Sequence, residues 1–109
     1  AQHRLLDLVR QGNGPWSGHG LQTILGHIDA TFPLAEDARY TRVVGWAFDL
    51  AVKKLPQYVA LLDCNGDVIG LAVTGIYRKD LQKKVAVDAE YAGFEGYALA
   101  EKKICSIAY

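Results

Sequence analysis

Residues 63–67 read Asp-Cys-Asn-Gly-Asp and separate two apolar runs, YVALL at 58–62 and VIGLAV at 68–73. Asn-Gly is the preferred central pair of a type I′ hairpin turn, because both central residues need positive φ. The twist of this turn also matches the twist of the strands that it joins. The stretch therefore predicts an antiparallel hairpin formed by the two runs.

Further short strands are predicted on both sides of this hairpin. Val, Ile, Tyr, Phe and Trp are concentrated in segments that turn residues separate, which is typical of short strands. Residues 78–91 fit a helical turn, a long polar loop or, at 85–87, a short edge strand. Strands joined by turns, without alternating long helices, favour an all-β fold. The expected architecture of residues 21–109 is an antiparallel β-sandwich, immunoglobulin-like or similar, with a small barrel as the alternative. The predicted strands are residues 24–31, 40–49, 57–64, 67–75, 94–100 and 104–109.

Residues 1–20 are predicted to lie outside the sandwich, as a short N-terminal helix or tail. One side of a helix at residues 3–10 is apolar, and the sequence Gly-Asn-Gly-Pro at 12–15 ends it. A helix this short is not stable alone in water. It therefore either packs on the domain or ends a preceding domain, with residues 11–20 as the linker. The chain begins at Ala1 without an initiator Met or a leader, so we expect it to be a piece of a longer protein.

The predicted strand at 40–49 alternates bulky and small side chains. Successive side chains of a strand point to opposite faces of the sheet. We expect the bulky face to lie in the core, and we expect another part of the chain to pack closely over Gly45 and Ala47. The bulky face carries Tyr40, Arg42, Val44, Trp46 and Phe48, and the small face carries Thr41, Val43, Gly45, Ala47 and Asp49.

The composition indicates one folded domain without a strong electrostatic field. Of 109 residues, 50% are hydrophobic and 22% are charged, which excludes a disordered chain. The 12 basic and 12 acidic side chains cancel, and the lysine doublets are isolated among acids, so we expect no nucleic-acid partner. Charged residues interrupt every apolar stretch, so the chain is not expected to span a membrane. The localisation stays open between the cytoplasm and the cell envelope.

Cys64 and Cys105 are the two cysteines. Neither belongs to a Cys-x-x-Cys pair, and neither has a His at zinc-binding spacing. We expect both thiols to be reduced and half-buried, with a cross-strand disulfide as the alternative.

No catalytic or metal-binding pattern stands out. Asp63, Asn65 and Asp67 are similar to the opening ligands of a calcium loop, but Val68 and Thr74 occupy the places of its Gly and Glu. The serines and histidines are scattered without a nucleophile elbow. A glycosidase needs two carboxylates across a cleft, whereas we expect these acids to cap turns or to lie in solvent. We predict no catalytic residue, metal or cofactor. The carboxylates considered are Asp49, Asp80, Asp88, Glu90 and Glu95.

Exposed aromatic rings are the feature best suited to a ligand. Ring faces stack on the C–H faces of sugars, while polar groups at the rim hold the hydroxyl groups. Trp16 and Tyr77 lie in glycine-rich or polar surroundings and are expected to be exposed. Arg78 and Asp80 are the candidates for the rim, although we expect them to pair with each other and to lock their own loop.

A set of short motifs points to a known type of module: GWAFD at 45–49, GHID at 26–29, DCNGDVIG at 63–70, RKD at 78–80 and AGFEGY at 92–97. In this order they resemble a small all-β accessory domain of bacterial proteins, of the G-W-A-x-D type. Such domains occur beside glycosyltransferases and other enzymes of envelope polysaccharide synthesis. The resemblance implies a non-catalytic sandwich attached to an enzyme, and it implies no ligand. Lys79 stands where we expect a Pro in this module.

The expected function is therefore that of a non-enzymatic accessory module. It would pack against an adjacent domain of a longer chain or against a partner protein. A second copy of the same chain, in a homodimer, is a further alternative. Carbohydrate binding through exposed aromatic rings is the first alternative. A small hydrolase with paired carboxylates is the second.

Overall fold

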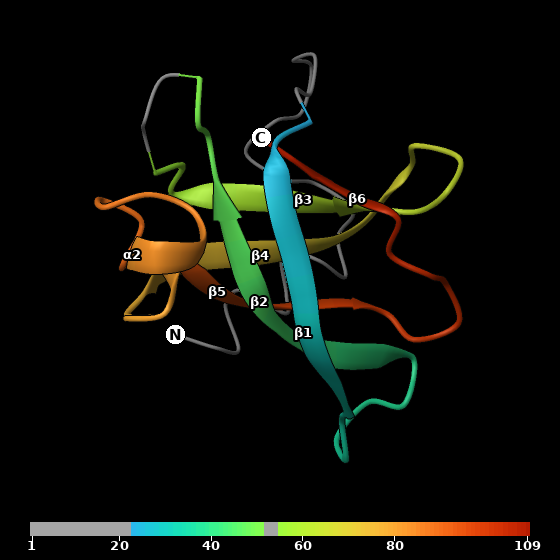
Figure 1. Cartoon of the computed structure of the whole chain (residues 1–109). Coiled ribbons are helices and arrows are strands. Elements are labelled where there is room, and N and C mark those ends of the chain that lie inside the picture. The colour runs from blue at the N-terminus through green and yellow to red at the C-terminus, as the bar shows by residue number, and fades with distance from the viewer. Residues whose placement is uncertain (1–22, 52–54) are drawn as a thin grey trace.

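The computed structural model describes residues 23–51 and 55–109. Six antiparallel strands form one sheet in the order β1-β2-β5-β4-β3-β6, and all six predicted strands are present (Figure 1). Within the described residues no helix is long and apolar enough to cross a membrane. The predicted helix and linker at 1–20, and with them Trp16, lie outside the described residues. The strands are β1 (Leu25–Pro33), β2 (Tyr40–Phe48), β3 (Tyr58–Leu62), β4 (Val68–Ile76), β5 (Gly93–Leu99) and β6 (Ser106–Ala108).

The hairpin of β3 and β4 is confirmed, but its turn differs from the predicted type. Asp63 N donates to Asp67 O over 2.9 Å, and Gly66 N donates to Asp63 O over 3.1 Å, so the loop has three residues rather than two. Gly66 occupies the last position of this loop and has a positive φ of 84°. Three-residue hairpin loops end in this way, with a glycine in the left-handed region. The side chain of Asp63 stabilises the three-residue loop, because its carboxylate accepts hydrogen bonds from the N–H groups of Asn65 and Asp67.

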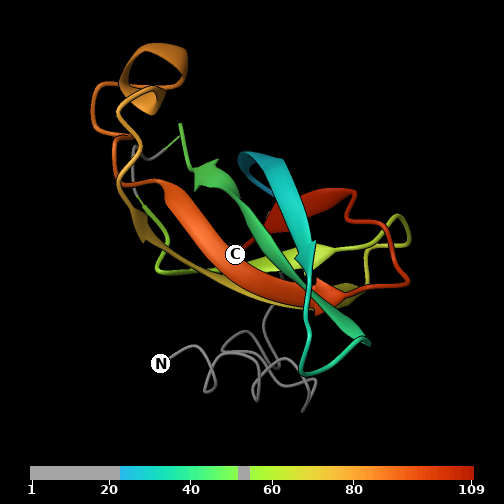
Figure 2. The same cartoon turned by 90° about the horizontal axis from the view of Figure 1, so that it is seen from below.

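The sheet curls into a half-barrel, so the predicted β-sandwich is not confirmed. A sandwich needs two sheets that face each other, whereas all six strands here are hydrogen-bonded in one series. The two ends of the series meet at one point, through a bridge between Thr23 and Ala108 and a 3.0 Å bond from Ile24 N to Ile107 O. Figure 2 shows the curvature of the sheet from below.

The concave face of β2 carries the small side chains, which reverses the predicted orientation. Val43 and Ala47 are fully buried in the main core, whereas Trp46 is only partly buried. The interior of a tightly curled sheet is narrow, so small residues from neighbouring strands fill it. Close packing over Gly45 is confirmed, since a Cβ there would lie 2.2 Å from His27 O. The main core consists of Val43, Ala47, Val59, Leu61, Ala72, Phe94, Ala98 and Ile107.

A second cluster covers the bulky face of β2. Phe48 is 1% exposed and packs with Leu81, Ala89 and Ala92. Leu81 belongs to α2 (Leu81–Lys84), so the helical turn is the correct alternative for this segment, and residues 85–87 form no strand. Phe48 and, in part, Trp46 therefore pack under the connection from β4 to β5 instead of in the barrel.

Candidate functional site

Arg78 and Asp80 form the ion pair that the sequence predicts. Arg78 Nε and Nη2 donate to the two carboxylate oxygens of Asp80 over 2.9 and 2.8 Å. Arg78 Nη1 reaches a third acceptor, Asp29 Oδ2, over 2.5 Å. The hydrogen bond from Arg78 is the main cause that holds the pKa of Asp80 below its ordinary value. These groups are satisfied by one another, so their evident role is to lock the end of β4 to β1.

Tyr77 is exposed, as predicted, and a second ring that the sequence analysis did not single out lies beside it. Tyr77 and Tyr91 are 54% and 52% exposed. Their ring centroids are 5.3 Å apart at an interplanar angle of 60°, which is an edge-to-face contact. Gln82 Nε2 donates to Glu90 Oε2 over 2.7 Å on the same connection between β4 and β5. In the sequence, α2 and the residues around it separate Tyr91 from Tyr77, so only the fold reveals that the two rings are in contact.

The carboxylates considered for catalysis bind different partners. Asp49 is buried and accepts from Ala51 N and from the hydroxyl group of Tyr109. Glu95 accepts from Arg42 Nε over 2.9 Å, across two neighbouring strands. Among the described residues no group of three or more His, Cys, Asp or Glu side chains could hold a metal ion. Asp49 thus stabilises a turn, and Glu95 forms an ion pair between strands.

A groove opens where the half-barrel fails to close. It has a volume of about 520 Å³ and lies between β1 and the connection from β5 to β6. Ile28, Leu34, Tyr40, Leu99 and Ile104 contribute apolar side chains to its walls. A second hollow of about 440 Å³ shares Ile28 and Ile104 with the first, so the two hollows adjoin each other. We refer to both together as the seam groove.

Two lysines give the seam groove its charge. Lys102 and Lys103 line the larger hollow, and no Asp or Glu of the described residues lines either hollow of the seam groove. Arg39 and Glu101 line a further hollow that shares Tyr40 and Leu99 with the larger one. Neither lysine forms an ion pair with a residue of 23–51 or 55–109. The groove therefore combines apolar walls with a basic rim, a combination suited to a partner with apolar and anionic groups.

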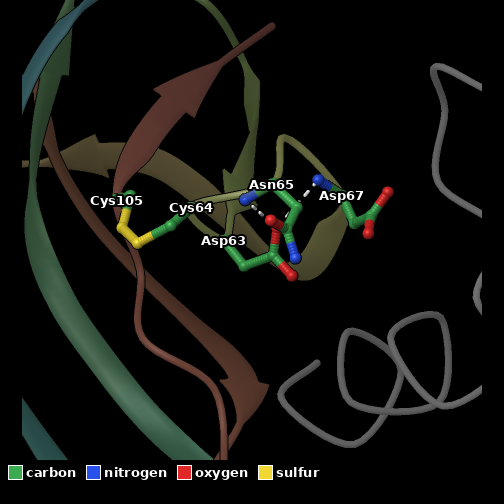
Figure 3. Close-up of a disulfide and its surroundings, with 5 residues drawn as sticks. All are labelled: Asp63, Cys64, Asn65, Asp67 and Cys105. Carbon is green, nitrogen blue, oxygen red and sulfur yellow. Dashed lines mark hydrogen bonds between the residues drawn. A yellow bond between two sulfur atoms is a disulfide. The ribbon is translucent and has the colours of Figure 1, made fainter.

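A disulfide holds one wall of the seam groove, which corrects the expectation of reduced, half-buried thiols. Cys64, in the loop after β3, is bonded to Cys105, just before β6 (Figure 3). The Cα atoms lie 5.0 Å apart, within the usual range for a disulfide, and both residues are exposed. The disulfide is the alternative that the sequence analysis left open, and the fold decides for it, because the contact depends on β6 returning to the edge of β3. Cys105 itself lines the smaller hollow, so the disulfide ties this wall to the hairpin.

No family model, no curated protein and no solved structure matches this chain.

Proposed function

We propose that this domain is a non-catalytic interaction module that holds an adjacent domain or a partner protein in the seam groove. The supporting observation is the apolar groove beside β1, an edge strand that pairs with β2 alone among the named strands of the described chain. Binding sites in proteins are concave and mostly apolar, with a few polar groups that orient the ligand. The parent protein that we propose is a bacterial protein of envelope glycan synthesis, from the resemblance around residues 45–49.

The experiment is a selection of random dodecapeptides displayed on phage against the whole chain. Selected peptides are titrated into ¹⁵N-labelled protein, and the amide shifts are mapped. We expect the largest shifts at Thr31 and at Ile104, which line the groove. Thr31→Arg places a long cation in the mouth of the groove and should weaken binding by about tenfold or more.

Val87→Arg is the matched control, because it adds the same side chain at a position that is 79% exposed and does not line the groove. It should leave the affinity unchanged. The proposal is overturned if no selected peptide shifts the groove residues, or if the two arginine variants behave alike.

Carbohydrate binding is a second candidate, supported by the exposed pair of Tyr77 and Tyr91. One ring could stack on a sugar while the second forms a side wall, with the Gln82–Glu90 pair close by in sequence. A glycan array tests this function with Tyr77→Ala, Tyr91→Ala and Trp16→Ala. Loss of a glycan signal in these variants, but not in Val87→Ala, would support it, and an array without any signal would contradict it.

A further inference from the structure

We propose that the occupant of the seam groove is an extended, acidic peptide segment, which adds as a further strand of the half-barrel to the edge of β1 that no named strand of the described chain covers. This inference rests on the proposed function and specifies the chemistry of its partner. It combines three observations: the outer edge of β1, which pairs with no named strand of the described chain, the shape of the groove and the charge of its rim.

The edge of β1 offers backbone groups for pairing. Strands of an antiparallel sheet point part of their N–H and C=O groups away from each neighbour. The side of β1 that faces away from β2 meets a named strand only at its N-terminal end. There the two residues before β1 contact β6: Thr23 pairs with Ala108, and Ile24 N donates to Ile107 O. Beyond this contact, the groove lies between β1 and the segment that leads from β5 into β6. An added strand would supply the missing hydrogen bonds, which is how peptides bind exposed sheet edges.

Two features of β1 limit the length of such a strand. The register with β2 shifts between Ile28 and Ala30, which leaves Asp29 in a bulge. Pro33 at the end of the strand has no N–H group to donate. Bulges and prolines protect edges against unspecific pairing with long strands. We therefore expect a short segment whose affinity comes largely from side chains in the groove.

The groove suits alternate side chains of an extended peptide. Ile28 and Thr31 lie on the face of β1 that opposes Gly45 and Val43, so they point to the concave side. Side chains of an added strand would follow the same period of two. Every second residue would then meet the apolar walls at Ile28 and Ile104, and the residues between would face solvent or the rim.

Charge selects the polar positions of the peptide. Lys102 and Lys103 are exposed and are the two described residues with a permanent charge that line the seam groove, while Arg39 and Glu101 line the adjoining hollow. A glutamate or aspartate close to them forms ion pairs, whereas a lysine meets repulsion. Both lysines are in contact with solvent, so the preference should weaken as salt rises.

The test uses two synthetic octapeptide libraries with random apolar residues at every second position. One carries Glu at the positions between, and the other carries Lys. Affinity for the whole chain is measured by calorimetry, and the site is mapped by amide shifts. We expect the Glu library to bind at least about tenfold more tightly at low salt. A Glu library with N-methylated backbone amides should lose about tenfold or more, because it cannot donate to β1.

The double variant Lys102→Glu/Lys103→Glu should reverse the preference between the libraries. Lys83→Glu is the matched control, since Lys83 is exposed on α2 and does not line the groove. It should change nothing.

The outcomes separate this inference from the proposed function. Groove binding with no preference for Glu, or with no effect of N-methylation, overturns the acidic strand and leaves the interaction module standing. Absence of any groove-directed shift, from either library or from the phage peptides, overturns both. A homodimer detected by sedimentation and abolished by Thr31→Arg would assign the groove to a second copy and would also overturn the acidic partner.

Discussion

Arg78 donates to Asp29 over 2.5 Å although 49 residues separate them in the chain. Asp29 lies at the bulge of β1, and Arg78 follows the end of β4. The same guanidinium group holds Asp80 through two further hydrogen bonds. One cation thus fixes the twisted part of the edge strand to the connection that carries α2.

Arg78→Lys should destabilise the fold, because an ammonium group cannot hold two carboxylates in the planar geometry of a guanidinium group. We expect the melting temperature to fall by about 2–5 °C. Thermal unfolding followed by circular dichroism measures the change. Lys79→Arg is the control at the neighbouring position. An Arg78→Lys variant that melts with the wild type would contradict the assigned role.

Asp80→Asn should remove a pH-dependent part of the stability. Arg78 lowers the pKa of folded Asp80, so the pair stabilises the fold above the ordinary Asp value of about 4. This contribution is lost as the pH falls through the lowered folded value. The melting temperatures of wild type and variant should therefore differ at pH 7 and converge toward pH 2. A constant difference over this range would contradict the prediction, and Asp88→Asn, an exposed acid outside the cluster, serves as the control.

Gly96→Ala should be among the more damaging changes of a single methyl group. A Cβ at Gly96 would lie 2.2 Å from Leu71 O and 2.5 Å from Ala72 Cα. These are backbone atoms of the neighbouring strand and cannot move aside, so we expect a loss of about 1–3 kcal/mol or more. Gly66→Asn is the comparison, because nothing lies within 4 Å of a Cβ there and Asn tolerates the φ of 84°. Urea denaturation should show the larger loss for Gly96→Ala.

The double variant Cys64→Ser/Cys105→Ser should lower the free energy of unfolding by about 2–4 kcal/mol, because the disulfide closes a separation of 41 residues. Dithiothreitol should destabilise the wild type by a similar amount and leave the variant unchanged. Amide exchange should accelerate first in β6, a strand of 3 residues that pairs with β3. A wild type that resists the reductant without any loss of stability would exclude this role for the disulfide.

The wild type should lose stability at alkaline pH through the ionisation of Tyr109, and Tyr109→Phe should remove this loss. The hydrogen bond that Tyr109 donates to Asp49 is the main cause that raises the pKa of the phenol above its ordinary value. The neutral phenol is favoured in the folded state, so its contribution is complete below pH about 10 and is lost as the pH rises through the raised value. The stability difference between wild type and Tyr109→Phe should shrink as the pH rises above about 10. Tyr58→Phe is the control, and a difference that does not change with pH would refute the assignment.

Much of the local structure could be predicted because it depends on neighbours in the chain. The position of the hairpin follows from the Asn-Gly pair, and the helical turn at 81–84 was one of the alternatives. The Arg78–Asp80 pair could be expected because only Lys79 lies between its members. Tyr91, Asp29 and the seam groove could not be foreseen, since each depends on segments that the fold brings together.

The sequence by itself determined where the chain extends and where it turns, because alternation of side chains and turn chemistry act over a few residues. Apart from the hairpin of β3 and β4, the tertiary structure decided which strands pair, and so it decided between a sandwich and a half-barrel. It also decided which face of β2 points inward, because alternation alone cannot tell the barrel interior from the space under α2, where Phe48 packs. The disulfide of Cys64 with Cys105 also depends on the tertiary structure, because it forms where β6 pairs with β3. The seam groove exists because the start of the described chain and β6 meet only at the bridge between Thr23 and Ala108.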